Sequence, residues 1–193
     1  MAERAWVFAY GSLAHPASAA ETLGDRTGRR AVPATLEGWR RGFTQARDNR
    51  RCEKTFALPD GGLPAHVLGL NVHPDEEERV SGVAIEVTGA ELARLDGREL
   101  RYDRDDVTAQ VLAVEPLGGT VHVFRAKPEH LALEPPPGAV ILRSYLEAVE
   151  AAFTALGADA VAELRRSIHP LPAPVVEGRL VGGEIPPGNP RAW

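Results

Sequence analysis

The chain has 193 residues, the usual length of a single domain with a sizeable core. Hydrophobic residues make up 44% and charged residues 25%, which excludes wholesale disorder, and no stretch approaches the roughly 20 apolar residues of a membrane span. The net charge of −5 argues against general nucleic-acid binding.

The single cysteine, Cys52, excludes an internal disulfide and a thiolate metal cluster. The N-terminus runs into a short apolar segment and lacks the hydrophobic region of a signal peptide. We therefore expect a cytoplasmic protein with no membrane and no nucleic-acid partner. The sequence leaves the oligomeric state open.

Basic residues gather in the first part of the chain. Residues 1–54 contain ten Lys or Arg against six Asp or Glu, and Arg40, Arg41 and the segment 47–51 can form a basic face. This pattern fits a solvated strand edge or a site for an anionic small molecule as well as it fits a nucleic-acid surface.

The N-terminal segment predicts one strand and one helix. The apolar residues 6–10 are typical of a short buried strand, which the turn at 11–12 ends. Pro16 suits the first turn of a helix that continues to Leu23.

The middle of the chain predicts further strands. They are expected over residues 31–44, with an interruption at Gly38, and over 67–72. An acidic surface loop follows at 75–78, and the β-branched segment 82–87 predicts another strand.

A capping box then predicts a short helix. Thr88 and Glu91 have the required spacing, and Gly97 is expected to stop the helix. Residues 107–114 and 120–124 predict two strands of a hairpin.

Apolar residues at helical spacing predict a later helix that closes the core. They are Leu142, Leu146, Val149, Phe153 and Leu156. Gly157 is expected to end this helix, and Asp159 to cap a second helix that stops before Pro170.

The predicted strands and helices do not alternate as in a doubly wound sheet. We therefore predict the α+β class: a single domain with a mainly antiparallel or mixed, barrel-like sheet flanked by helices. The domain is expected over residues 1–169, and a Pro/Gly-rich C-terminal extension over 170–193.

The first segment with chemical potential is Tyr10-Gly11-Ser12-Leu13, at the end of the first strand. Glycine allows the main chain to approach a ligand closely, and successive N–H groups in such a turn can hold a carboxylate or a developing oxyanion. The alternative is a plain strand-ending turn, in which the Ser12 hydroxyl satisfies the main chain.

The second segment contains Glu99, between a helix end and the next strand. A helix C-terminus and partial burial both raise the pKa of a carboxyl group, which would suit a general base. The alternative is a surface glutamate paired with Arg98, Arg101 or Arg104.

Other chemistries find less support. The chain has no G-x-S-x-G elbow for a Ser12 nucleophile, no phosphate-binding loop and no G-x-G-x-x-G segment. The histidines lack metal-ligand spacing, so we predict no metal site and no cofactor. They are His15, His66, His73, His122, His130 and His169.

Taken together, the segments resemble the γ-glutamylcyclotransferase family. The matching pieces, in order, are VFAYGSL at 7–13, GVAIEV at 82–87, ELARLDGRE at 91–99 and a helix that begins near RSYL at 143–146. The resemblance implies a barrel-like sheet flanked by helices, a γ-glutamyl compound as small-molecule substrate and no metal or organic cofactor.

The resemblance also implies roles for particular residues. Glu99 would be the general base, and Tyr10, Gly11 and Ser12, with the adjoining Leu13, would hold the γ-glutamyl group. Two further tyrosines, Tyr102 after the glutamate and Tyr145 in the late helix, would contact the substrate. We therefore expect Glu99, Gly11-Ser12 and Tyr145 to line one cavity.

The implied reaction is an intramolecular cyclisation of the acyltransferase or lyase type. The α-amine of the substrate attacks its own γ-carbonyl and releases 5-oxoproline and a free amine. Leu13 stands where many members of the family carry Asn, so the donor stays open among glutathione, γ-glutamyl amino acids, γ-glutamylamines and protected metabolites. The alternative of another class is a catalytically silent binding or interaction protein of the same fold.

Overall fold

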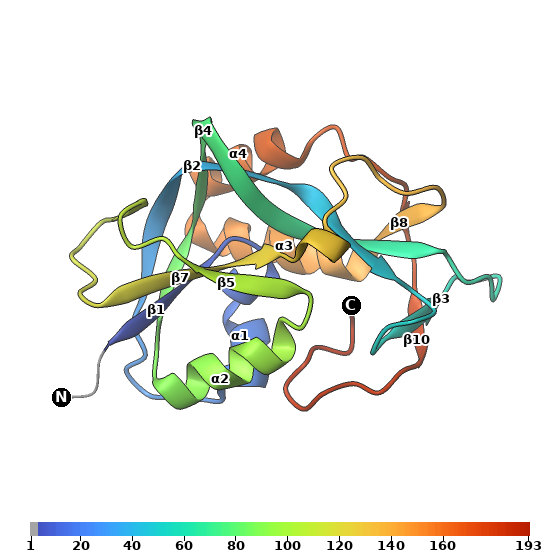
Figure 1. Ribbon diagram of the computed structural model, residues 1–193, viewed down its shortest axis with the longest axis horizontal. Coiled ribbons are helices and arrows are strands. Elements are labelled where there is room, and N and C mark those ends of the chain that lie inside the picture. The colour runs from blue at the N-terminus through green and yellow to red at the C-terminus, as the bar shows by residue number, and fades with distance from the viewer. Residues whose placement is uncertain (1–3) are drawn as a thin grey trace.

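Two long strands form the frame of the sheet in the computed structural model, which describes residues 4–193 (Figure 1). Strand β2 (Ala31–Asp48) runs antiparallel to β4 (His66–Val87) along nearly its whole length. Residues 1–3, the start of the domain predicted over 1–169, lie outside the described part.

The remaining strands extend this pair into a mixed sheet. Its hydrogen-bonded order is β5-β7-β1-β4-β2-β6, mostly antiparallel, with β1 parallel to β7; β8 pairs parallel with β4, and β9 with β8. The order runs from β5 at one end to β6 at the other. The strands are β1 (Ala5–Ala9), β5 (Tyr102–Asp106), β6 (Val111–Ala113), β7 (Thr120–Ala126), β8 (Ala139–Leu142) and β9 (Val175–Val176).

Helices flank the sheet, so the α+β class predicted from the sequence is confirmed. Helices α1 and α2 lie side by side below the sheet in Figure 1, and α3 and α4 lie behind it. They are α1 (Pro16–Leu23), α2 (Gly89–Arg98), α3 (Arg143–Leu156) and α4 (Ala158–Ile168), with short 3₁₀ helices η1 (Ser12–Ala14) and η2 (Pro128–His130).

The core gathers around the central strand β1. Trp6, Val7 and Phe8 are all buried, on both faces of the strand, because β1 lies between β4 and β7. A strand buried on both faces has no polar alternation, which explains its continuous apolar sequence.

The predicted loop at 75–78 is wrong. Residues 67–72, 75–78 and 82–87 belong to one strand, β4, and Glu76 to Arg79 are exposed along it. In the β2–β4 ladder, Trp39 pairs with Pro74 and Glu37 with Arg79, so residues 75–78 bulge out of the ladder opposite Gly38 and have no partner on β2.

The predicted hairpin of 107–114 with 120–124 is also wrong. Strand β6 pairs with β2, whereas β7 pairs with β1 and with β5. Strand β5 was not predicted, because its residues, Tyr102–Asp106, are mostly charged and lack an alternation of apolar and polar side chains. The interruption at Gly38 corresponds to a register shift in the β2–β4 ladder, where Gly38 has φ of +75°.

The helix signals were more reliable. Both bonds of the Thr88–Glu91 capping box are present, and α3 ends before Gly157 as predicted. Two details are wrong: α2 continues through Gly97 to Arg98, and Gly157 rather than Asp159 is the N-cap of α4.

The C-terminal segment 170–193 returns to the domain. Strand β10 (Arg179–Gly182) pairs antiparallel with β3 (Thr55–Ala57). In Figure 1 the chain then loops below the β3–β10 pair toward the side of α2, and its end lies near the centre of the view.

The capping box yields a stability prediction. Thr88→Ala removes the oxygen that accepts from the Glu91 N–H and should lower the free energy of unfolding by about 1 kcal/mol. Glu91→Gln should cost more, about 1–3 kcal/mol, because the buried Glu91 carboxylate also pairs with Arg29 at 2.7 Å and Arg26 at 3.3 Å. Urea unfolding measures both.

The cost of Glu91→Gln should depend on pH. Burial alone would raise the pKa of Glu91, but the Thr88 N–H and the Arg29 guanidinium outweigh it and lower the pKa. A lowered pKa stabilises the fold above the pKa of the unfolded chain, and this contribution is lost as the pH falls through the folded value. The parent and Glu91→Gln should therefore converge in strong acid; equal stability at pH 7 would contradict the account.

Candidate active site

Glu99 stands at the junction of α2 and β5. It is the C-cap of α2: its N–H donates to the Leu95 carbonyl at 2.8 Å, and its own carbonyl accepts from the Tyr102 N–H at 2.9 Å. These two main-chain bonds restrict the conformation of the connection between α2 and β5. The direction of the Glu99 side chain is therefore set by the end of α2.

Arg98 fixes this junction to the neighbouring helix. Its buried guanidinium donates to the Ser18 carbonyl at 2.7 Å, the Ser18 hydroxyl at 2.9 Å and the Thr22 hydroxyl at 2.9 Å, all on α1. Its Nε lies 3.1 Å from the Glu99 carboxylate. The pairing with Arg98 considered from the sequence is therefore present, but the carboxylate lines a cavity.

An inner cavity joins Glu99 to the turn after β1. It is lined by Glu99 and by the other residues singled out from the sequence: Tyr10, Gly11, Ser12, Leu13, Tyr102 and Tyr145. A Cβ on Gly11 would lie 3.4 Å from the Tyr145 hydroxyl oxygen, so any side chain there would fill part of this space. The fold brings together residues that are up to 135 positions apart.

The three tyrosines are held by main-chain groups. Tyr10 donates to the Phe124 carbonyl at 2.6 Å, and Tyr102 donates to the Leu70 carbonyl at 2.8 Å. Tyr145 differs, because its oxygen accepts from the Leu70 N–H at 3.1 Å. The Tyr145 hydroxyl therefore keeps its own hydrogen for another acceptor.

Burial keeps these tyrosines neutral. It raises the pKa of Tyr145 to about 12, with a further contribution from the charge of Glu99, and it raises the pKa values of Tyr10 and Tyr102 well above 10.0. At neutral pH they act as hydrogen-bond donors and as walls of the cavity.

A buried arginine supports the turn after β1. The Arg41 Nη1 donates to the Tyr10 carbonyl at 3.1 Å and to the Ser81 carbonyl at 3.0 Å, and the guanidinium also pairs with Glu163 of α4. Arg41 therefore does not belong to the basic face that the sequence left open as one possibility. No local signal revealed its role, because its partners come from distant segments.

The pKa of Glu99 is raised. Burial is the largest cause, while the charges of Arg98 and Lys54 lower the pKa and offset part of the effect. Burial thus makes the Glu99 carboxyl group a weaker acid, while the nearby cations favour its ionised form.

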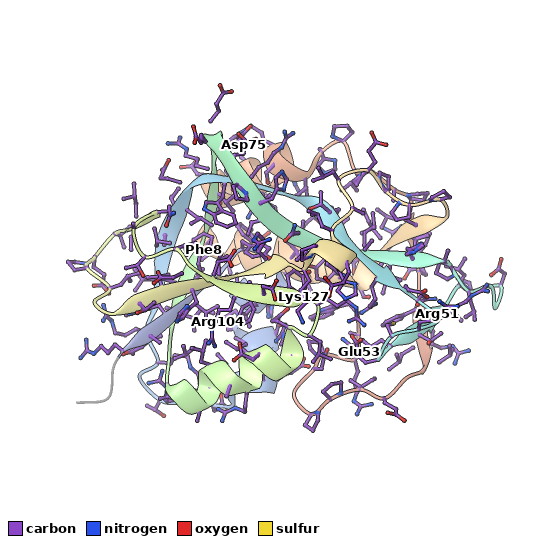
Figure 2. The ribbon with its side chains drawn as sticks, viewed as in Figure 1. Phe8, Arg51, Glu53, Asp75, Arg104 and Lys127 are labelled. Atoms are coloured by element: carbon purple, nitrogen blue, oxygen red, sulfur yellow. The ribbon has the colours of Figure 1, made fainter. Side chains whose placement is uncertain are left out.

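An outer cavity opens beyond Glu99 and shares Ser12, Tyr102 and Tyr145 with the inner one. Its wall is basic, with Arg47, Lys54, Arg98 and Arg101, and the side chains of Gln45 and Glu53 also line it. Figure 2 places Glu53 between the β3–β10 pair and the C-terminal end, and Asp75 on the opposite side of the molecule.

The C-terminal segment forms one side of the outer cavity. Asn189, Pro190 and Trp193 line it, and the Trp193 ring packs 6.3 Å from that of Tyr145. The Asn189 amide donates to the Arg98 carbonyl at 3.2 Å. That this segment reaches the site was not predicted from the sequence.

Within residues 4–193, no group of three or more His, Cys, Asp or Glu side chains is arranged to hold a metal ion. In the same part of the chain, no helix combines the length and the apolar character that a membrane crossing requires.

A comparison with family models matches residues 7–139 to the family described as gamma-glutamyl cyclotransferase, AIG2-like. The match covers residues 7–9 of β1, the turn after it, Glu99 and the strands around them. No protein of curated function matches the sequence.

Solved structures share the fold. YkqA from Bacillus subtilis superposes with a TM-score of 0.60 at 20% identity over 88% of this chain, which spans 56% of the YkqA chain. A gamma-glutamyl cyclotransferase gives 0.59 at 15% identity, over 84% of this chain and 87% of its own. A glutathione-specific gamma-glutamyl cyclotransferase from yeast gives 0.55 at 13% identity, over 86% and 98%.

The environment of Glu99 predicts its titration. Its carboxyl resonance, followed by NMR, should titrate with a midpoint above the ordinary value of 4.5. In Lys54→Met the midpoint should rise further, because a cation that favours the ionised form is lost. A midpoint at or below 4.5 in the parent would mean that the carboxylate is solvated like a surface glutamate.

Proposed function

The chain belongs to the gamma-glutamyl cyclotransferase, AIG2-like family, and we propose that it is an enzyme that cyclises the γ-glutamyl group of a small-molecule amide. The products are 5-oxoproline and the free amine. The observation that carries the proposal is the position of the Glu99 carboxylate on both cavities, together with Ser12 and Tyr145.

The inner cavity is proposed to hold the γ-glutamyl group in a folded conformation. Ring closure is intramolecular, so correct placement of the α-amine against the γ-carbonyl supplies much of the acceleration; effective molarities for such steps reach about 10⁵–10⁸ M. A small cavity walled by Tyr10, Tyr102 and Tyr145 favours the folded over the extended donor.

Glu99 is proposed to remove the proton from the α-amine, which is mostly an ammonium at neutral pH. Its raised pKa brings it closer to the pKa of the amine and makes the proton transfer less unfavourable. Glu99 then passes this proton to the leaving nitrogen as the amide C–N bond breaks. The attacking nitrogen loses a second proton as it becomes the lactam N–H, and this proton reaches the departing amine, which leaves as an ammonium ion. The carboxyl group ends the cycle ionised, as it began.

The turn after β1 is proposed to bind one of the two oxyanions of the reaction, the α-carboxylate or the tetrahedral oxygen. Helix η1 begins at Ser12, so the N–H groups of Ser12 and Leu13 have no acceptor within the helix. The Tyr145 hydroxyl, whose hydrogen is free, is proposed as a further donor to the substrate.

The expected location is the cytoplasm, on the grounds of the single cysteine. The test of the function is direct. The purified protein is incubated with γ-glutamyl amino acids, γ-glutamylamines and glutathione, and 5-oxoproline is measured. If no donor yields 5-oxoproline, the alternative of a silent binding protein is favoured instead.

Substitution of Glu99 tests the mechanism. Glu99→Gln keeps the size of the side chain but cannot take the proton, so kcat should fall about 10²–10⁴-fold with little change in KM. The matched control is Glu78→Gln, on the exposed part of β4, which should leave kcat unchanged. If Glu99→Gln turned over at nearly the parent rate, another group would be the base.

A further inference from the structure

The outer cavity contains more positive than negative side chains. Four of its lining residues are basic and two are acidic: Arg47, Lys54, Arg98 and Arg101 against Glu53 and Glu99. Among the side chains of the wall, cations therefore outnumber carboxylates by two when Lys54 is protonated. Uncompensated buried charge is unfavourable, and an anionic ligand would offset it.

The ion pairs show where the excess lies. Glu53 takes both terminal nitrogens of Arg101 and lies 4.0 Å from Arg47, and Glu99 pairs with Arg98. Over residues 4–193, no Asp or Glu oxygen lies within 4.0 Å of the Lys54 ammonium. Lys54 instead donates to the main-chain oxygen of Trp193 at 2.6 Å, which uses one of its three hydrogens.

Two further donors of the same wall lack partners. Gln45 is 5% exposed, and its Nε2 is buried with no hydrogen-bond acceptor among the described residues. The Nε of Arg47, two residues later on the same strand, is likewise buried without a hydrogen-bond acceptor among the described residues. A buried donor without an acceptor is costly, so a ligand oxygen at this position would be favourable.

The pKa of Lys54 is consistent with an anion-binding wall. Burial, and next the charge of Arg47, lower its pKa to about 7; Arg98 acts in the same direction, and Glu53 and Glu99 oppose it. A bound anion would favour the protonated form and strengthen the contact.

We propose that this wall, formed by Gln45, Arg47 and Lys54, binds a carboxylate on the leaving group of the donor. The inference rests on the proposed function and deepens it: the substrates are γ-glutamyl amides of amino acids or peptides, and amides of neutral amines are poor donors. The scissile bond lies beside Glu99, and the leaving nitrogen departs from there into the outer cavity.

A matched pair of donors tests the proposal. γ-Glutamylglycine and γ-glutamylglycinamide differ only in the charge at the end of the leaving group. The parent should favour the acid by about 10–100-fold in kcat/KM, the range expected for charge-assisted hydrogen bonds from buried donors. Equal kcat/KM values for the two donors would overturn the proposal.

Substitutions in the wall test whether it causes the preference for the acid over the amide. Gln45→Glu has the same shape and places a negative charge opposite the donor carboxylate, so it should lower kcat/KM for γ-glutamylglycine at least tenfold and change the value for the amide by less than about threefold. Gln110→Glu makes the same change at an exposed position between β5 and β6 and should leave both values unchanged. An unaltered preference in Gln45→Glu would refute the assignment.

Lys54→Met removes the charge while keeping an unbranched side chain only one atom shorter, and it should abolish most of the preference. Because Lys54 is buried, this variant is used only if its unfolding is cooperative; otherwise Gln45→Glu decides. A folded Lys54→Met variant with the parent's preference would overturn the role of Lys54.

The subsite and the proposed reaction can fail separately. If neither donor yields 5-oxoproline, the reaction is refuted, and calorimetric binding to the parent then tests the subsite: tighter binding of γ-glutamylglycine than of its amide supports it, and equal binding overturns it. If both donors react with equal kcat/KM, the reaction stands and the subsite is refuted.

Discussion

The arrangement of the site depends on the buried guanidinium of Arg98. One side chain joins the end of α2 to Ser18 and Thr22 of α1 and, through its Nε, contacts the carboxylate of the next residue, Glu99. Because α1 follows directly after the turn that ends β1, this contact sets the distance between Glu99 and that turn. The carbonyl of Arg98 also accepts from Asn189, so the C-terminal segment is fixed to the same point.

Glu99 lies where two cavities of different character meet. The inner cavity has aromatic walls. The outer one has a basic wall, in which Lys54 donates to the Trp193 main-chain oxygen and, among the described residues, has no Asp or Glu side chain as partner. Burial raises the pKa of Glu99, and the cations of the outer wall limit the rise. The same cations that favour the ionised form of Glu99 would attract a carboxylate on the proposed donor, so the strength of the proposed base and the proposed choice of substrate are linked through one set of charges.

Much of this site was predictable from short segments. Two parts of the site follow from local patterns: Gly11-Ser12 follows an apolar strand, and Glu99 ends a helix that begins with a Thr88–Glu91 capping box. Such patterns depend only on neighbouring residues, so they can be recognised without knowing the fold. What the sequence could not give is non-local: β4 as one strand depends on its pairing with β2, and the roles of Arg41 and Lys54 depend on partners far along the chain. One of the explanations left open for the basic run near residue 50, a site for an anionic small molecule, agrees with the carboxylate subsite proposed above.

The most direct test of the central claim asks which nucleophile attacks the γ-carbonyl. An accepted donor is turned over in water enriched in ¹⁸O, and the products are analysed by mass spectrometry. Intramolecular attack by the α-amine predicts 5-oxoproline without ¹⁸O, because water takes no part in bond formation. Glutamate carrying one ¹⁸O in its γ-carboxylate would contradict the account and identify the protein as a hydrolase.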